Sequence, residues 1–285
     1  MKKGYSIFTE TIADMTWLEV EEAASKGAVM LVPVGVIEQH GPHLPLATDI
    51  YAATLMCSLL KGNLGQQGIL SVIAPPYYFG INEATGMFPG SISVKSESMI
   101  SLLSDLLVSY MHQGFRRQFI INHHGDSRHN NAIVEAIRSA LKQGVDAVWI
   151  MGGLVAFAVE RALRNASPPL PASAVLKVEA SDQTKRARET LSRSQMHIHA
   201  EERETSLIMK WFPELLKRKE EIKRLKPLLP DLELFFGAEM KGKWRELSPL
   251  GYIGDPSVAS VENAELYTCE VRDMAAAIAQ RLEGN

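Results

Sequence analysis

The side chains best suited to chemistry in this chain are histidines and carboxylates that follow predicted strands. Glu38 and His40 lie two positions apart in the segment 35–49, directly after a short apolar run. In an extended segment, side chains two positions apart leave the same face, so both can reach neighbouring positions on one metal ion. The alternative is that Thr48 or Asp49 caps a helix and that the loop residues are solvated. Because open α/β sheets bind ligands at the carboxyl ends of their strands, we interpret the segment as a metal-binding loop.

A second segment of the same kind follows another predicted strand. His124 and Asp126 repeat the spacing of two positions. Imidazole nitrogen and carboxylate oxygen are the ligand set of zinc, manganese or iron, rather than of calcium or of an ion bound by thiolates. His123 and His129 lie in the same segment, and each is read first as a supporting or surface residue. Two strand ends that deliver histidine and carboxylate together predict metal-dependent hydrolysis.

A third polar segment, 196–206, contains His199 and Glu204 at a predicted helix start. Acidic residues in a first helical turn stabilise the helix dipole and need no further function, so this segment alone decides nothing. The segment 250–260 has the Gly, Asp and Pro content of a tight turn before the last helix. These two segments gain meaning only in combination with the others.

The elements that must position these residues alternate between short β-branched runs and longer helical patterns, which predicts an α/β fold with a mostly parallel central sheet. The pattern breaks down at about 161–196, and we expect a lid or loop excursion there, with a linker as the competing interpretation. A strongly basic helix is predicted over 215–225. The predicted strands are 28–35, 69–74, 118–122 and 146–151, and the other predicted helices are 16–26, 48–60, 96–113, 129–143 and 264–282.

Composition excludes several classes of protein. The chain has 285 residues, 46% of them hydrophobic, and its 30 Lys and Arg against 33 Asp and Glu leave a net charge of −3. Such values are typical of a globular protein, and a near-neutral chain without a long basic run is not expected to bind nucleic acid. The two cysteines lie far apart in apolar helical patterns, which favours buried thiols in a cytoplasmic protein. No run approaches 18 apolar residues, so neither export nor membrane insertion is expected.

In combination, these segments resemble the creatininase (creatinine amidohydrolase) family. The most specific motif is G-x-x-E-Q-H-G-P-H-L-P-L-x-T-D at 35–49, and weaker motifs agree with it in order and spacing. The resemblance implies a single three-layer α/β/α domain over residues 1–285, assembled into a homo-oligomer that is often a hexamer. The weaker motifs are F-P-G-S-I-S at 88–93, N-x-H-G-D at 122–126, H-A-x-E-x-E-T-S at 199–206 and G-D-P-x-x-A-S at 254–260.

The same resemblance implies two divalent ions per chain, Zn²⁺ or Mn²⁺ or both, with Fe²⁺ also suitable. Its implied activity is hydrolysis, in which a hydroxide that bridges the ions opens a cyclic amide or cleaves a related C–N bond of a small-molecule substrate. His199 would then carry a proton to the leaving group. By position, the residues implied at the site are Glu38 and His124 for one ion, His40 and Asp126 for the other, Asp49 as the bridge, and His199 with Glu204 as the catalytic pair.

Departures from the family pattern leave some points open. Asp126 stands where creatininases proper have Glu and many relatives have Gly, so either Asp126 or Glu204 completes the second metal site. His123 replaces a usual Gly. The excursion at 161–196 is more basic and polar than a creatinine pocket, which favours a polyhydroxylated or anionic substrate over creatinine. The alternatives are hydrolysis of a keto-inositol ring such as that of 3-dehydro-scyllo-inosose, a non-catalytic metal-binding subunit, and a metal-dependent polyol isomerase.

Overall fold

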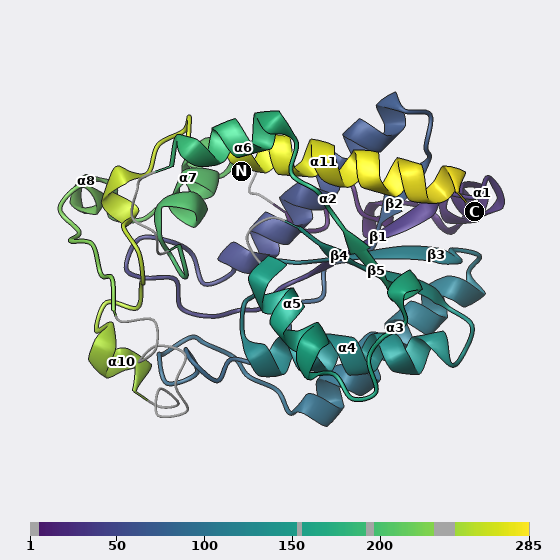
Figure 1. Ribbon diagram of the computed structural model, residues 1–285, viewed down its shortest axis with the longest axis horizontal. Helices are drawn as coiled ribbons and strands as arrows, with labels where there is room; N and C mark the ends of the chain where they lie inside the picture. Colours follow the sequence, from purple (N-terminus) through teal and green to yellow (C-terminus); the bar gives the residue numbers. More distant parts are fainter. Residues whose placement is uncertain (1–5, 153–155, 192–196, 231–242, 285) are drawn as a thin grey trace.

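A parallel sheet forms the centre of the computed structural model, which describes residues 6–152, 156–191, 197–230 and 243–284 (Figure 1). Across these residues the strand order is β2-β1-β3-β4-β5, and every neighbouring pair is parallel. The α/β fold with a mostly parallel sheet, predicted from the sequence, is therefore confirmed. The strands are β1 (Val29–Val34), β2 (Ser71–Ile73), β3 (Arg117–Asn122), β4 (Asp146–Met151) and β5 (Val175–Lys177).

Strand β1 is apolar along its whole length because both of its faces are covered. All six residues of β1 are buried. Met30 and Val32 pack into one hydrophobic cluster and Leu31 into another. Continuous apolar runs are typical of strands inside a parallel sheet, whereas a strand with one exposed face would alternate. The residues that follow Val34 therefore leave from the interior of the fold.

Helices cover both faces of the sheet, which gives the three α/β/α layers that the family resemblance implies (Figure 1). Residues of α3 and α4 pack with Met30 and Val32, and residues of α2 and α11 pack with Leu31. The helices on the first side are α3 (Ser96–His112), α4 (Ser127–Leu141) and α5 (Ala156–Asn165), and on the second side α2 (Thr48–Gln66), α7 (Glu202–Trp211) and α11 (Glu265–Glu283). The remaining elements are η1 (Ile12–Asp14), α1 (Trp17–Ser25), η3 (Ala172–Ala174), α6 (Asp182–Glu189), α8 (Lys219–Ile222), α10 (Trp244–Leu247) and η5 (Pro256–Val258).

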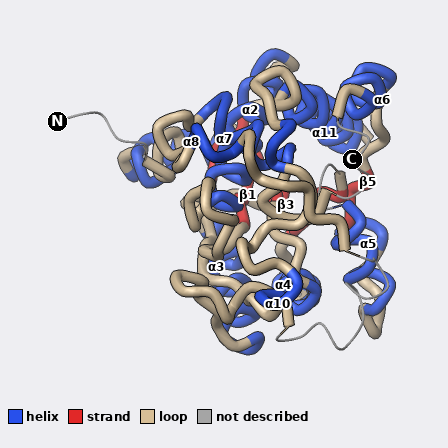
Figure 2. Tube along the Cα trace, turned by 90° about the vertical axis from the view of Figure 1, so that its left-hand side faces the viewer, coloured by secondary structure: helices blue, strands red, loops and turns tan. Residues whose placement is uncertain are grey.

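The carboxyl ends of β1 and β3 lie side by side. Val34 at the end of β1 is paired with Asn122 at the end of β3. Viewed from this end of the molecule, loops lie in front of both strands (Figure 2). The polar segments that begin at Gly35 and His123 therefore start next to each other, at the edge where parallel sheets bind their ligands.

The segment 161–196 differs from the predicted loop or lid over its described part, which ends at residue 191. It contains strand β5, which extends the sheet beside β4, and helix α6. The chain around α6 is tied to α11, because Ser181 N donates to Asp273 and Arg188 donates to Glu270 at 3.0 Å. The prediction missed both elements because β5 has only three residues and α6 is charged along most of its length.

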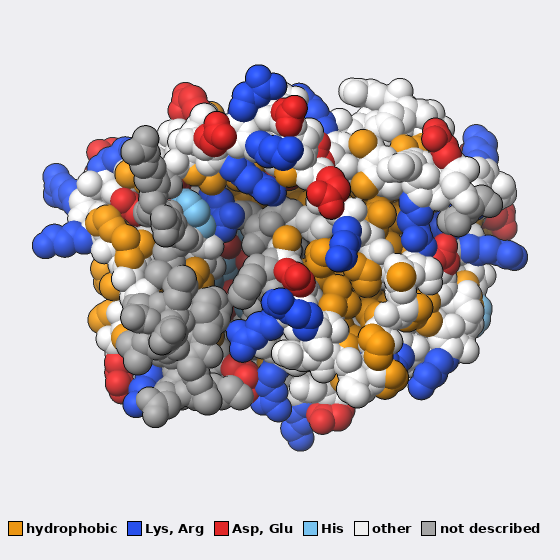
Figure 3. All heavy atoms as spheres, in the orientation of Figure 1, with side chains coloured by type: hydrophobic (Ala, Val, Ile, Leu, Met, Phe, Trp, Pro, Cys, Tyr) orange, Lys and Arg blue, Asp and Glu red, His pale blue; other side chains and the backbone are white. Residues whose placement is uncertain are grey.

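Three basic side chains of α6 contact α6 itself or α11. Lys185 pairs with Asp182, and Arg186 Nε donates to the Asp182 carbonyl. Arg188 pairs with Glu270, whereas Arg193 lies outside the described residues. Lys and Arg side chains gather at the upper edge of the molecule, where α6 lies (Figure 3). Selection of an anionic or polyhydroxylated substrate by this segment stays a prediction.

Two further predictions concern the C-terminal third. The basic helix expected over 215–225 is reduced to the four residues of α8, because Arg218 adopts a left-handed backbone with φ of 46°. Helical backbone cannot continue through such a residue. The last predicted helix, 264–282, is confirmed by α11. Within the described ranges, we find no helix with the length and apolar character needed to cross a membrane.

Candidate metal centre

A close approach of two backbone segments brings Asp49 to the end of β1. Gly35 directly follows β1, and a Cβ atom on it would lie 2.9 Å from the backbone carbonyl carbon of Asp49. No side chain larger than that of glycine fits at this distance. The N-cap residue of α2 is Ala47, and no side chain caps the helix there. Asp49 lies inside the first turn of α2. Asp49 is therefore not the helix cap that the alternative interpretation proposed.

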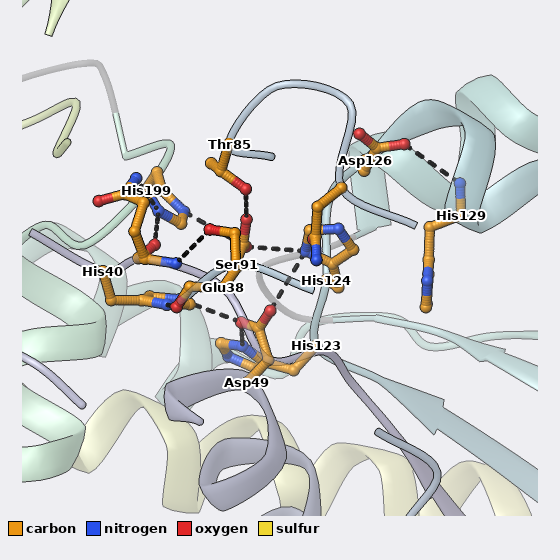
Figure 4. Close-up of polar contacts among 12 residues, drawn as sticks. Glu38, His40, Asp49, Thr85, Ser91, His123, His124, Asp126, His129 and His199 are labelled. Atoms are coloured by element: carbon orange, nitrogen blue, oxygen red, sulfur yellow. Dashed lines mark hydrogen bonds and ion pairs between the residues drawn. The ribbon is translucent and has the colours of Figure 1, made fainter. Parts of the chain in front are cut away.

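The two carboxylate oxygens of Asp49 face two different groups of side chains (Figure 4). Oδ2 lies 3.2 Å from Nδ1 of His124, which lies 3.0 Å from Oε1 of Glu38. Oδ1 lies 3.3 Å from Nε2 of His40, which lies 3.8 Å from Oε2 of Glu204. All five side chains are buried. Each of these two groups is compact enough to hold a metal ion, and they share the Asp49 carboxylate. Glu38, His40 and His199 form a third compact group, which lacks Asp49.

Backbone carbonyls determine which nitrogen of each imidazole faces the carboxylates. Nε2 of His124 lies 3.1 Å from the carbonyl oxygen of Ile81, and Nδ1 of His40 lies 3.1 Å from the carbonyl oxygen of Glu38. A carbonyl only accepts, so these two nitrogens carry the protons. Nδ1 of His124 and Nε2 of His40 are therefore the nitrogens that would present lone pairs to a metal ion once their protons are displaced, with the other nitrogen of each ring donating to a carbonyl, as in histidines that bind metals.

The buried charges stabilise one another. Burial alone would raise the pKa values of Glu38 and Asp49, but the neighbouring imidazoles outweigh burial and lower both pKa values. The reverse holds for His40, because burial lowers its pKa but Asp49 and Glu204 raise the pKa to about 10. Three carboxylates in one buried cluster attract positive charge, and a divalent ion would displace the imidazole protons.

The donor geometry fits divalent ions. Two atoms of the cluster, Nε2 of His40 and Oδ2 of Asp49, form no hydrogen bond of acceptable geometry. Nε2 of His40 nevertheless lies 3.3 Å from Oδ1 of Asp49, and Oδ2 of Asp49 lies 3.2 Å from Nδ1 of His124. Ligand atoms about 2.0–2.1 Å from one tetrahedral ion are separated by about 3.3 Å. The separations therefore match those of atoms around a common ion, and the nitrogen and oxygen donors suit zinc, manganese or iron.

His199 lies beside these groups in a defined orientation. Its Nε2 lies 2.7 Å from the backbone carbonyl oxygen of Gln39 and 3.0 Å from the side-chain nitrogen of the same residue. The shorter contact, to an acceptor, favours the proton on Nε2, with Nδ1 3.8 Å from Oε1 of Glu38. Gln39 is held in turn by its side-chain amide, which donates to the Gly251 carbonyl at 2.7 Å. The ring of Trp244 packs edge-on against His199, with ring centroids 5.7 Å apart. The predicted catalytic histidine is thus buried, oriented and adjacent to the ligand groups.

Asp126 does not join the cluster, so its contacts do not support the ligand role that the family resemblance implies. Its Oδ1 accepts from the backbone N–H groups of Arg128 at 2.8 Å and His129 at 3.2 Å, and so caps α4. Its Oδ2 accepts from the backbone N–H of Glu83 at 2.9 Å. Figure 4 shows this carboxylate on the far side of His124. Backbone groups use both oxygens, and Glu204 stands beside His40 in the place expected for Asp126.

Besides Trp244, two further residues that contact the site were not indicated by the sequence. Thr85 donates its hydroxyl to Oε2 of Glu38, and Tyr267 of α11 stacks on His123. Neither residue belongs to a polar motif, because Thr85 lies in a long loop and Tyr267 lies within a helix. Only the tertiary structure brings them to the cluster. His129, which the sequence left undecided, is buried beside His124 but belongs to neither ligand group.

Curated proteins of known activity are similar to this chain. The chain is 27% identical over 268 residues to a mycofactocin precursor peptide peptidase of Mycobacterium ulcerans, which is 90% of this chain and 86% of that relative. It is 28% identical over 127 residues to a 3-dehydro-scyllo-inosose hydrolase of Thermotoga maritima, covering 44% of this chain and 38% of that relative. It is 26% identical over 138 residues to a creatinine amidohydrolase of Pseudomonas putida, covering 46% and 50%. The chain thus spans less than two thirds of the last two relatives.

Solved structures share the fold. A structure described as "Creatininase Mn" matches with a TM-score of 0.67 at 22% identity, over 96% of this chain and 98% of that chain. A creatininase variant of Zn-Zn type matches with a TM-score of 0.65 at 21% identity, over 98% and 99%. The sequence profile of the creatininase family, described as creatinine amidohydrolase, matches residues 13–279. The chain therefore belongs to the creatininase family of hydrolases.

Proposed function

We propose that this protein is a metal-dependent hydrolase that cleaves an amide C–N bond with two divalent ions. The proposal rests on the orientation of the Asp49 carboxylate, whose Oδ1 faces His40 and whose Oδ2 faces His124. Glu38 and His124 would hold one ion, and His40 and Glu204 the other. When bound, two such ions polarise a substrate carbonyl and lower the pKa of a shared water toward neutrality. Zn²⁺ and Mn²⁺ are the ions to test first, because related structures are described with them.

The side chains of the protein position the reactants and move the proton. With Nε2–H of His199 held by the Gln39 carbonyl, Nδ1 can accept a proton from the attacking water and pass it to the leaving nitrogen. The edge of Trp244 against the His199 ring keeps the imidazole from turning away. Thr85 fixes the carboxylate of Glu38 through its hydroxyl, so the ligand oxygen keeps its direction.

The relatives favour an amide as the substrate. Two of the three are named for cleavage of amides, as a peptide peptidase and as an amidohydrolase. The peptidase aligns with 90% of this chain, whereas the inosose hydrolase aligns with 44%. Hydrolysis of a keto-inositol ring is therefore the second candidate. Assembly into a homo-oligomer and a cytoplasmic location stay predictions.

A metal count tests the proposed centre. Protein stripped by a chelator and reloaded with Zn²⁺ or Mn²⁺ should hold about two ions per chain by mass spectrometry. Asp49→Ala should lose both ions together, because the bridging carboxylate is shared. His129→Gln is the matched control, since His129 is buried with its ring 4.9 Å from that of His124 and lies outside both groups. A single tightly bound ion that survives Asp49→Ala would contradict the dinuclear centre.

An activity screen tests the reaction. The reloaded protein would be offered cyclic amides, short peptides and keto-inositols in water enriched in ¹⁸O. We expect cleavage of an amide with one labelled oxygen in the product. Turnover of keto-inositols alone would support the second candidate, and isomerisation without uptake of label would refute a hydrolase.

A further inference from the structure

His123 lies at nearly the same distances as His40 from two carboxylates, those of Asp49 and Glu204. Nδ1 of His123 lies 3.5 Å from Oδ1 of Asp49 and 3.9 Å from Oε1 of Glu204. Nε2 of His40 lies 3.3 Å from the same oxygen of Asp49 and 3.8 Å from Oε2 of Glu204. Figure 4 shows the two imidazoles approaching Asp49 from different directions. Each imidazole therefore directs one nitrogen toward the same two carboxylates.

The other nitrogen of His123 faces a buried tyrosine. Nε2 lies 3.5 Å from the hydroxyl of Tyr267, and the two rings stack with centroids 6.0 Å apart and an interplanar angle of 28°. Both side chains are buried. A tyrosine hydroxyl can accept a hydrogen bond, so it suits a proton on Nε2 and leaves the lone pair on Nδ1. Histidines that bind metals typically donate their second N–H to such a partner.

The contacts of the His123 ring with Asp49 and with Tyr267 are both 3.5 Å long. Both exceed the usual range of about 2.7–3.2 Å for hydrogen bonds, so neither is a short hydrogen bond. The separations of His123 from Asp49 and Glu204, 3.5 and 3.9 Å, resemble those of His40, 3.3 and 3.8 Å. Asp126 is used by the backbone of α4 and of the Glu83 loop. An ion at this group would otherwise have only three protein donors.

We propose that His123 binds, through Nδ1, the ion held by His40, Asp49 and Glu204. This inference rests on the proposed dinuclear centre. Two imidazoles and two carboxylates would give this ion four protein donors, and the shared water would then be a fifth ligand, which zinc can accept. The Glu38 group supplies three donors and leaves a position for water or substrate, as in catalytic sites. The two ions would therefore differ, with the nitrogen-rich site holding Zn²⁺ firmly and the oxygen-richer site exchanging its ion more readily.

NMR of the protein labelled with ¹⁵N-histidine and loaded with Zn²⁺ tests this inference directly. The nitrogen shifts distinguish rings bound to zinc through Nδ1 from rings bound through Nε2. We expect two rings bound through Nδ1, those of His123 and His124, and one bound through Nε2, that of His40. One Nδ1-bound ring, with the proton of His123 on Nδ1, would overturn the inference and leave the proposed function intact. Failure of Zn²⁺ to bind at all would refute the proposed function itself.

Calorimetric titration with Zn²⁺ gives a second measurement. His123→Gln should weaken one of two binding events by at least about tenfold and leave the other unchanged. Tyr267→Phe should weaken the same event by less, and His129→Gln should change neither. Two unchanged binding events in His123→Gln would overturn the inference. If His123→Gln does not fold, the number of Nδ1-bound rings in the wild-type protein decides the question.

Discussion

Replacing Asp126 by Ala should destabilise the fold without removing a metal ion. The carboxylate accepts hydrogen bonds from two N–H groups of the first turn of α4 and one from Glu83 in the loop between β2 and α3. Loss of an N-cap costs about 0.5–2 kcal/mol, and loss of a hydrogen bond to a charged group costs about 1.5–3 kcal/mol. Because both losses arise from one side chain and are not additive, we expect the free energy of unfolding to fall by about 3 kcal/mol.

Asp126→Asn provides the matched comparison. The amide oxygen of Asn can still cap α4, because Asn and Asp are equally good at N-cap positions. The NH₂ group cannot accept the hydrogen bond from Glu83, so a smaller loss of about 1–2 kcal/mol is expected. Arg128→Ala removes the ion pair between Arg128 and Glu83 but keeps the carboxylate of Asp126. This pair is exposed on the Arg128 side, so its removal should cost less than either change at Asp126.

The assay combines urea unfolding with a metal count. Unfolding is measured on metal-free protein, because a bound ion would add stability by mass action. The expected order of destabilisation is Asp126→Ala, then Asp126→Asn, then Arg128→Ala, with two ions per chain in each reloaded variant. An Asp126→Asn protein of wild-type stability that holds one ion fewer would refute this reasoning and restore Asp126 as a metal ligand.

Three further predictions follow from individual contacts. His199→Ala should keep both ions in the metal count and lose turnover by roughly 10²–10⁴-fold; loss of an ion would instead make His199 a ligand. Gly251→Ala should destabilise the protein by more than about 1–2 kcal/mol in urea unfolding, because Gly251 has φ of 80° and the new Cβ would lie 1.9 Å from Oε1 of Gln39; wild-type stability would contradict this. Burial raises the pKa of Glu270 despite the nearby guanidinium of Arg188. The folded state therefore binds this proton more tightly than the unfolded state, so the stability of the wild type relative to Glu270→Gln should fall as pH rises from about 4 toward neutrality. A difference in unfolding free energy that does not change with pH would contradict the last prediction.

The position of the site could be predicted because it depends on a property of all parallel sheets. The segments after β1 and β3 carry the polar residues, and neighbouring parallel strands end at the same edge. Long periodic helices were also predictable, as α3 and α11 illustrate. Strand β5 could not be predicted, because three residues are too few to show an alternating pattern. Helix α6 could not be predicted, because a mostly charged helix shows little apolar periodicity.

Other contacts of the site depend on tertiary packing that no local pattern records. Thr85 reaches Glu38 because the loop between β2 and α3 folds back over the end of β1, where Ile92 N also donates to the Ile37 carbonyl. Tyr267 reaches His123 because α11 crosses the sheet near the end of β3. In both cases the partner lies more than 40 positions away in the sequence.

The two pairs of residues spaced by two positions behave differently, and the reason is local. Glu38 and His40 both reach the cluster, because no helix begins until Thr48 and the loop between is determined by the site. Asp126 immediately precedes the first residue of α4, and an Asp at that position has several unpaired backbone N–H groups within reach. Capping competes with metal binding there, and in this structure the cap prevails. A rule based on spacing alone therefore holds only where the segment stays extended, and a carboxylate directly before a predicted helix should be tested first as an N-cap.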